Sequence, residues 1–134
     1  MSDPRALFAD LLSEQELAML VDGNGLVVAG AYPGADGRDV AHEVSAALTG
    51  VSDEAYRATR HLNVGAWRSI VFETEAAIVS LSPCHSEERR DEDSAAVVNM
   101  LVVAAAIGTP LGALARTTSR CLARASAWLA GELS

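Results

Sequence analysis

Lysine is absent from this sequence of 134 residues, and all ten basic residues are arginine. A phosphate-binding loop of the G-x-x-x-x-G-K-[ST] type needs a lysine, so the chain contains no loop of that type. The formal net charge of −8 argues against a nucleic-acid partner, because attraction to phosphates needs a basic face.

Cysteines, aromatic residues and long apolar runs are also scarce. Cys84 and Cys121 are the only cysteines, too few to indicate a disulfide framework. The longest apolar run, Ala95–Ile107, falls short of the ~20 residues that cross a bilayer, and the chain begins without a signal-peptide pattern. We therefore expect a soluble cytoplasmic protein without membrane insertion. Because only 4% of the residues are aromatic, we expect a core of Ala, Val and Leu that packs without a ligand cavity.

The apolar residues that are present suffice for one core. Half of the chain is hydrophobic, and its length is typical of a single domain over residues 1–134. Ala95–Ile107 contains four β-branched valines and no polar alternation, which predicts a central strand that is covered on both faces. A buried helix, favoured by Ala104–Ala106, is the alternative.

Three segments have helical periodicity. Asp3 and Pro4 are a typical helix start, and the apolar residues that follow predict a helix over Pro4–Ser13. A second helix is expected from Arg38 to Val51, with Asp36 as its N-cap and Gly50 near its end. The segment Ser52–Val64 either continues this helix through Tyr56 or loops back. The last and longest helix is predicted over Pro110–Gly131.

Two hairpins complete the expected sheet. Leu17–Val21 and Leu26–Ala31 flank Asp22-Gly23-Asn24-Gly25, a strong hairpin signal because the glycines accept positive φ. Trp67–Thr74 and Ala76–Ser82 are expected to form the second hairpin. The order αββαβββα predicts an α+β fold, an α/β/α sandwich around a five-stranded, mostly antiparallel sheet.

Catalytic patterns are sparse. Cys84-His85 is the only close pairing of a nucleophile with a base, but adjacent residues on a strand point to opposite faces. A structural thiol is therefore the preferred interpretation. His42 and His61 lack metal-ligand spacing, so no metal or cofactor is expected. A domain without a convergent polar cluster is expected to act through its surface rather than as an enzyme.

Two charged features remain. Glu87–Asp93 is a run of charged residues within the loop Pro83–Ser94, typical of a solvated tip. Arg116, Arg120 and Arg124 are spaced at i, i+4 and i+8 on the last predicted helix and form a basic stripe. The stripe is either a solvated helix face, a docking site for an acidic partner or a partner of Glu87–Asp93.

The order of elements and the residues at the joints resemble the Roadblock/dynein light-chain family. The matching features are Leu20-Val21-Asp22 with Gly25–Ala29 in the first hairpin, and the apolar strand that ends at Thr109-Pro110-Leu111-Gly112 before a helix containing Cys121-Leu122-Ala123. Within this family the chain is most similar to the bacterial MglB-like proteins, regulators of Ras-like GTPases.

This resemblance implies a sheet of strand order 2-1-5-4-3 and a homodimer formed through the middle helix and the third strand. It also implies a GTPase-activating type of regulator that inserts no arginine finger into a small Ras-like GTPase. A non-catalytic scaffold and a small-molecule sensor are the alternatives. The expected dimer interface consists of Val40, Val44, Ala47, Trp67, Ile70 and Phe72. The expected GTPase contact consists of Arg38, His42, Glu43 and Ala46.

Overall fold

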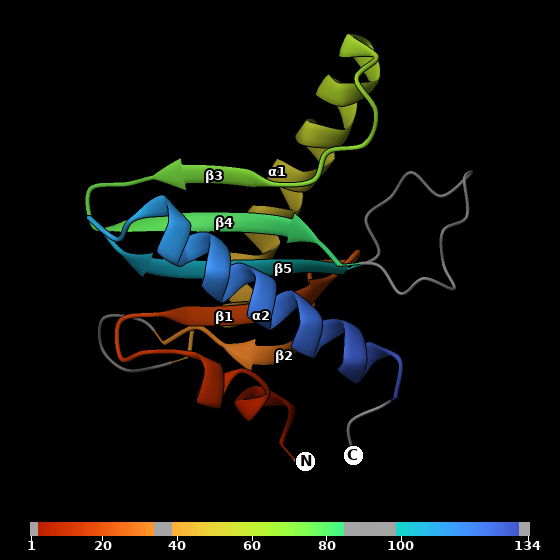
Figure 1. Ribbon diagram of the computed structural model, residues 1–134. Coiled ribbons are helices and arrows are strands. Elements are labelled where there is room, and N and C mark those ends of the chain that lie inside the picture. The colour runs from red at the N-terminus through yellow and green to blue at the C-terminus, as the bar shows by residue number, and fades with distance from the viewer. Residues whose placement is uncertain (1–2, 34–38, 85–98, 132–134) are drawn as a thin grey trace.

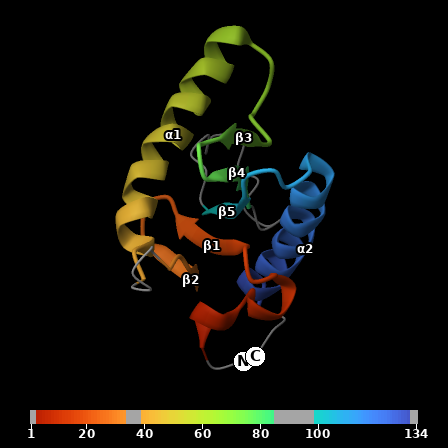
Figure 2. The same cartoon turned by 90° about the vertical axis from the view of Figure 1, so that its left-hand side faces the viewer.

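The computed structural model describes residues 3–33, 39–84 and 99–131. A five-stranded antiparallel sheet of strand order β2-β1-β5-β4-β3 lies between two helices (Figures 1 and 2). This arrangement confirms the predicted α+β class, element order and strand order. The strands are β1 (Leu17–Asp22), β2 (Val27–Ala31), β3 (Ile70–Glu73), β4 (Ala77–Pro83) and β5 (Asn99–Ala106), and the helices are α1 (Ala41–Leu62) and α2 (Leu111–Leu129).

The apolar run near residue 100 forms the central strand, as predicted. β5 pairs with β1 on one side and with β4 on the other, and it is buried from Met100 to Ala105. Its side chains alternate between two cores: Leu101 and Val103 pack on the α2 side, whereas Met100 and Val102 pack on the α1 side. The predicted residues 95–98 lie outside the described residues.

The first hairpin is confirmed, and its turn also positions α1. The Asp22 carboxylate accepts hydrogen bonds from the backbone N–H groups of Asn24 (2.9 Å) and Leu26 (3.0 Å). Gly25 has a φ of 82°, which glycine adopts without strain. The buried Ser45 hydroxyl donates a hydrogen bond of 2.6 Å to the Gly25 carbonyl, so the turn is joined to α1.

The predicted helix over Pro4–Ser13 is wrong in type. The segment forms two short 3₁₀ helices, η1 (Pro4–Ala6) and η2 (Ala9–Leu11), although Asp3 caps the first of them as expected. The carbonyl of Leu7 accepts a hydrogen bond from Arg124, and the Leu11 N–H donates to Phe8 instead. An α-helix would need the bond from Leu11 to Leu7, so this tertiary contact favours the tighter turn.

The middle helix is longer than predicted. α1 continues through Gly50 and ends at Leu62, so the open segment Ser52–Val64 is helical up to that residue. Gly50 has open space around it, and the left-handed cap residue is Asn63, with a φ of 53°. Asp36 lies outside the described residues, and the Asp39 carboxylate accepts the Ala41 N–H at 3.0 Å instead.

Two further boundaries differ from the prediction. The third strand begins at Ile70 rather than at Trp67, because residues 67–69 connect α1 to the sheet edge. The last helix begins at Leu111 with Pro110 as its N-cap, and it ends at Leu129. Both ends of the described chain lie on the same side of the molecule, near β2 (Figure 1).

Candidate interaction surfaces

The residues predicted for the dimer interface lie on the α1 side of the sheet. Ile70 is opposite Leu81 and Phe72 is opposite Val79, and both partners belong to the α1-side core. Trp67 packs against the same core. Val44 also packs there, Val40 is half-buried just before α1, and Ala47 is exposed on the helix. The structure therefore places these six residues along α1 and the adjacent sheet edge.

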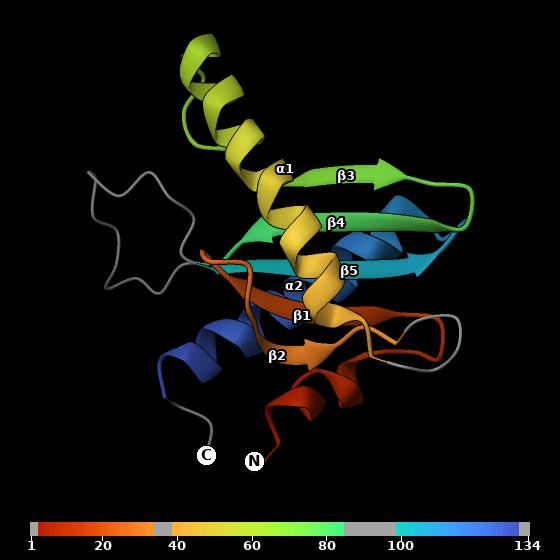
Figure 3. The same ribbon diagram turned by 180° about the vertical axis from the view of Figure 1, so that it is seen from behind.

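The second half of α1 extends past the sheet. In Figures 1 and 3 this helix crosses β3 and continues beyond it. Leu62 and Val64, at the far end of the helix, are each 68% exposed, and Val51 is 38% exposed. β3 is the last strand of the sheet, and on its outer side no strand of the described residues pairs with it. Apolar helix surface and a free strand edge thus lie together.

The junction between α1 and β3 contains an unpaired donor. The indole Nε1 of Trp67 is buried and has no hydrogen-bond partner among the residues that the structure describes. A buried N–H without a partner costs about 1 to 3 kcal/mol. The junction next to the free edge of β3 therefore contains a buried polar group that the described residues leave unsatisfied.

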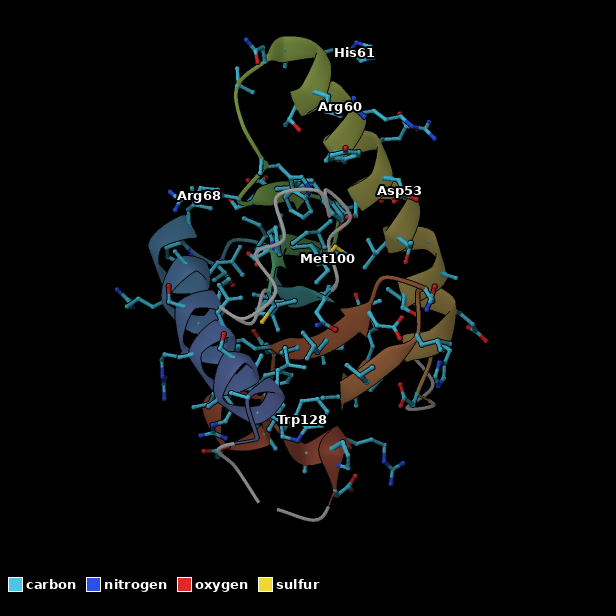
Figure 4. All side chains as sticks on the ribbon, turned by 90° about the vertical axis from the view of Figure 1, so that its right-hand side faces the viewer. Asp53, Arg60, His61, Arg68, Met100 and Trp128 are labelled. Atoms are coloured by element: carbon cyan, nitrogen blue, oxygen red, sulfur yellow. The ribbon has the colours of Figure 1, made fainter. Side chains whose placement is uncertain are left out.

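The far end of α1 is rich in arginine. Arg60 lies over the ring of Tyr56, 5.6 Å from its centroid, and Arg57 forms an exposed ion pair of 2.7 Å with Glu54. Figure 4 shows Arg60 and His61 at this end of the helix, away from the sheet. Exposed pairs of this kind contribute little to stability.

Three of the four predicted GTPase-contact residues are on the outer face of α1. His42, Glu43 and Ala46 are exposed within its first two turns. Arg38 lies outside the described residues. The core-facing side of the same turns is formed by Ala41, Ser45 and Leu48, so the outer face is available to a partner.

The predicted arginine stripe on α2 divides into two parts. Arg124 donates two hydrogen bonds to the Asp10 carboxylate, at 2.8 and 3.0 Å, and another of 2.9 Å to the Leu7 carbonyl. This hydrogen bonding to Arg124 lowers the pKa of Asp10 below 3.8. Arg116 and Arg120 instead line a surface cavity near the start of α2. Arg124 is therefore structural, whereas the other two arginines face solvent.

Sequence reasoning did not identify Glu16, which also lines this cavity. Its carboxylate accepts hydrogen bonds from the Ser13 N–H (2.9 Å) and from the Thr117 hydroxyl (2.7 Å). Burial acts to raise the pKa of Glu16, but these hydrogen bonds hold it below 4.5. The pattern Ser13-x-x-Glu16 is typical of a local side-chain-to-backbone bond, whereas nothing in the sequence indicates the contact with Thr117.

The two cysteines are buried on the α2 side of the sheet. Burial raises the pKa of both thiols, and that of Cys121 reaches about 11. The Sγ of Cys84 lies 3.8 Å from the Ser126 hydroxyl, while His85 lies outside the described residues. A protonated, buried thiol is a poor nucleophile, which favours the structural interpretation of Cys84.

Two searches of the described residues were negative. No group of three or more His, Cys, Asp or Glu side chains among them could hold a metal ion. Neither α1 nor α2, the long helices of the described ranges, is apolar enough over its length to cross a membrane.

No protein-family model and no curated protein matches the chain. Solved structures do match it. The Roadblock/LC7 domain from Streptomyces avermitilis is 19% identical, with a TM-score of 0.73 over 96% of this chain and 98% of that one. Myxococcus xanthus MglB is 13% identical, with a TM-score of 0.69 over 96% and 92%. The gliding protein MglB from Thermus thermophilus is 14% identical, with a TM-score of 0.68 over 94% and 90%. The chain therefore has a Roadblock/MglB-like fold, which confirms the resemblance seen in the sequence.

Proposed function

We propose that this protein is a homodimeric regulator of a small Ras-like GTPase, of the GTPase-activating type, and that it acts by protein contact. The observation that carries the proposal is the fold, which is shared with MglB over more than nine-tenths of both chains. The sparse catalytic patterns of the sequence agree with it, since the family resemblance implies a regulator that repositions the residues of its GTPase.

The dimer is proposed to form through α1 and β3. The free edge of β3, the exposed apolar residues of α1 and the unpaired indole N–H of Trp67 all lie on this side. An exposed strand edge is an aggregation hazard unless another element covers it. A second copy of the chain would extend the sheet across β3, as the family resemblance implies, and would cover this apolar surface by a self-complementary contact. A similar fold also occurs in a structure described as MglB with a tetrameric arrangement.

The GTPase is proposed to bind the outer face of α1, at Arg38, His42, Glu43 and Ala46. Three of these residues are exposed in the structure. A non-catalytic scaffold would use the same surface, and it differs only in leaving the hydrolysis rate unchanged.

The deciding experiment is single-turnover GTP hydrolysis by a small GTPase encoded beside this protein, with and without the protein. The mass of the complex is recorded by light scattering in the same samples. Faster hydrolysis in a complex of two copies with one GTPase supports the proposal. Binding without acceleration favours the scaffold instead, and the absence of a complex in both nucleotide states contradicts a GTPase partner.

Two variants, each with an exposed alanine replaced by arginine, test the contact surface. Ala46→Arg places a bulky charge on the outer face of α1, and we expect it to abolish binding and acceleration. Ala115→Arg makes the same change at an exposed position of α2, and we expect normal activity. Equal behaviour of the two variants would contradict the assignment of the GTPase to α1.

A further inference from the structure

A cavity of about 370 Å³ opens on the α2 side of the sheet, opposite the proposed dimer surface. It lies between the segment before β1 and the first turns of α2, at the end of β5, and Figure 2 looks onto this end of the molecule. Its volume is within the range of about 300 to 1,000 Å³ that is typical of small-molecule sites. Its lining is mostly polar, unlike the core beneath it.

Positive charge is in excess inside this cavity. Arg116 and Arg120 lie one helical turn apart on α2, and both residues line the cavity. Glu16 supplies one negative charge, and its low pKa keeps it ionised at neutral pH. Asp10, the nearby carboxylate on the N-terminal segment, also attracts Arg120, but both of its oxygens are bound by Arg124. Two cations therefore face one anion within a protein whose net charge is −8.

The lining of the cavity also has more free hydrogen-bond donors than free acceptors. The hydroxyl of Thr109 donates to the Ala106 carbonyl at 2.7 Å, and that of Thr117 donates to Glu16. Both oxygens of Glu16 already accept hydrogen bonds. Neither Arg116 nor Arg120 donates a hydrogen bond to any acceptor in the described ranges, although each guanidinium carries five N–H donors. The cavity therefore offers donors and charge to an acceptor that the described residues do not provide.

We propose that this cavity binds a small organic anion through a carboxylate or phosphate group, held by the guanidinium groups of Arg116 and Arg120. Arginine pairs with both groups in a bidentate geometry, which gives stronger and more specific bonds than a single ammonium would. The carboxylate of Glu16, which is hydrogen-bonded to Thr117 on α2, occupies one side of the cavity and disfavours a second anionic group there. The expected ligand therefore carries its charge at one end and a neutral polar part at the other.

Titration of the full chain with sodium phosphate and with sodium acetate, followed by ¹H–¹⁵N NMR, tests the site. Sodium chloride at equal ionic strength is the reference. We expect saturable shifts of the amide signals of Ala113 and Thr117 at millimolar concentrations with at least one of the two anions. A preference for phosphate assigns a phosphate group to the ligand, and a preference for acetate assigns a carboxylate. Shifts that sodium chloride reproduces, or no saturable shifts with either anion, overturn the proposal.

Matched double variants locate the binding. Arg116→Gln with Arg120→Gln removes both charges from the cavity, and binding should weaken at least about tenfold. Arg57→Gln with Arg60→Gln removes the same charge from α1 and should leave the affinity unchanged. Equal weakening in both double variants, or none in the first, contradicts the site. Because the cavity lies opposite α1 and β3, its failure would leave the proposed GTPase regulation intact.

Discussion

Arg124 and Asp10 form a bidentate ion pair that joins α2 to the N-terminal segment. The Nη1–Oδ1 distance is 2.8 Å and the Nη2–Oδ2 distance is 3.0 Å. The same guanidinium donates to the carbonyl of Leu7, whose side chain is fully buried. One arginine of the predicted basic stripe thus holds the first residues of the chain against the last helix.

This pair predicts an acid-dependent contribution to stability. The pKa of Asp10 is lowered from 3.8, chiefly by its hydrogen bond with Arg124, so the stabilisation is complete above pH 3.8 and is lost as the pH falls through the lower, folded-state value. Asp10→Asn should therefore unfold at lower urea concentration than the wild type at pH 7. The two urea midpoints should converge as the pH is lowered below 3.8. Asp53→Asn, on α1, is the control, and a gap between wild type and Asp10→Asn that persists in acid would contradict the role of the pair.

Gly30 and Gly50 should respond in opposite directions to replacement by alanine. Gly30 has a φ of 81°, and a Cβ there would lie 2.7 Å from the Cα of Met19 on the paired strand β1. Gly30→Ala should destabilise the protein by about 3 kcal/mol, because both the backbone conformation and the contact are strained. Gly50 lies within α1 with open space around it, and Gly50→Ala should stabilise by roughly 0.5 to 1 kcal/mol. Urea unfolding at one fixed protein concentration measures both, and a stable Gly30→Ala variant would contradict the register of β1 and β2.

The proposed dimer predicts that a charge on the α1 side changes the molecular mass. Ile70→Asp or Val44→Asp should give a destabilised monomer, because each places a carboxylate within the apolar surface that the second copy would cover. Leu111→Asp, at a residue 60% exposed on α2, should remain a dimer. Light scattering gives the masses directly. Dimeric mass in either of the first two variants would overturn the interface assignment.

The sheet was predictable because its signals are local. The valines of the apolar run and the turn Asp22–Gly25 act within a few residues, and the structure places Val102, Val103 and the turn as expected. The N-terminal helix was not predictable, because Arg124 binds the Leu7 carbonyl from 117 positions away. The end of α1 stayed open between Val51 and a continuation through Tyr56. Gly50 does not adopt the left-handed conformation of a helix cap, and Asn63 takes that role after Leu62.

The candidate surfaces were predictable only in part. The spacing of Arg116, Arg120 and Arg124 identified a basic face, but not that Arg124 pairs with Asp10 while the other two line a cavity. The bond between Arg124 and Asp10 spans 114 positions, and the bond of Glu16 to Thr117 in the cavity spans 101. Side chains that meet only after the sheet and helices have packed leave no periodic signal in the sequence.

A buried hydroxyl pair between the sheet and α2 gives the last prediction. Ser80 of β4 and Thr118 of α2 are 4% and 8% exposed, and their hydroxyl oxygens lie 2.8 Å apart. A threonine within a helix can turn its hydroxyl to the carbonyl four residues earlier, whereas a serine in the middle of a paired strand has no comparable acceptor. Thr118→Val should therefore cost about 2 kcal/mol of unfolding free energy and Ser80→Ala only about 1 kcal/mol. In the double variant neither hydroxyl is left unpaired, so its cost should be about 1 kcal/mol below the sum of the two single costs. Urea unfolding of all four proteins measures this coupling. Strictly additive costs would contradict a coupling of the two hydroxyls across the contact of α2 with β4.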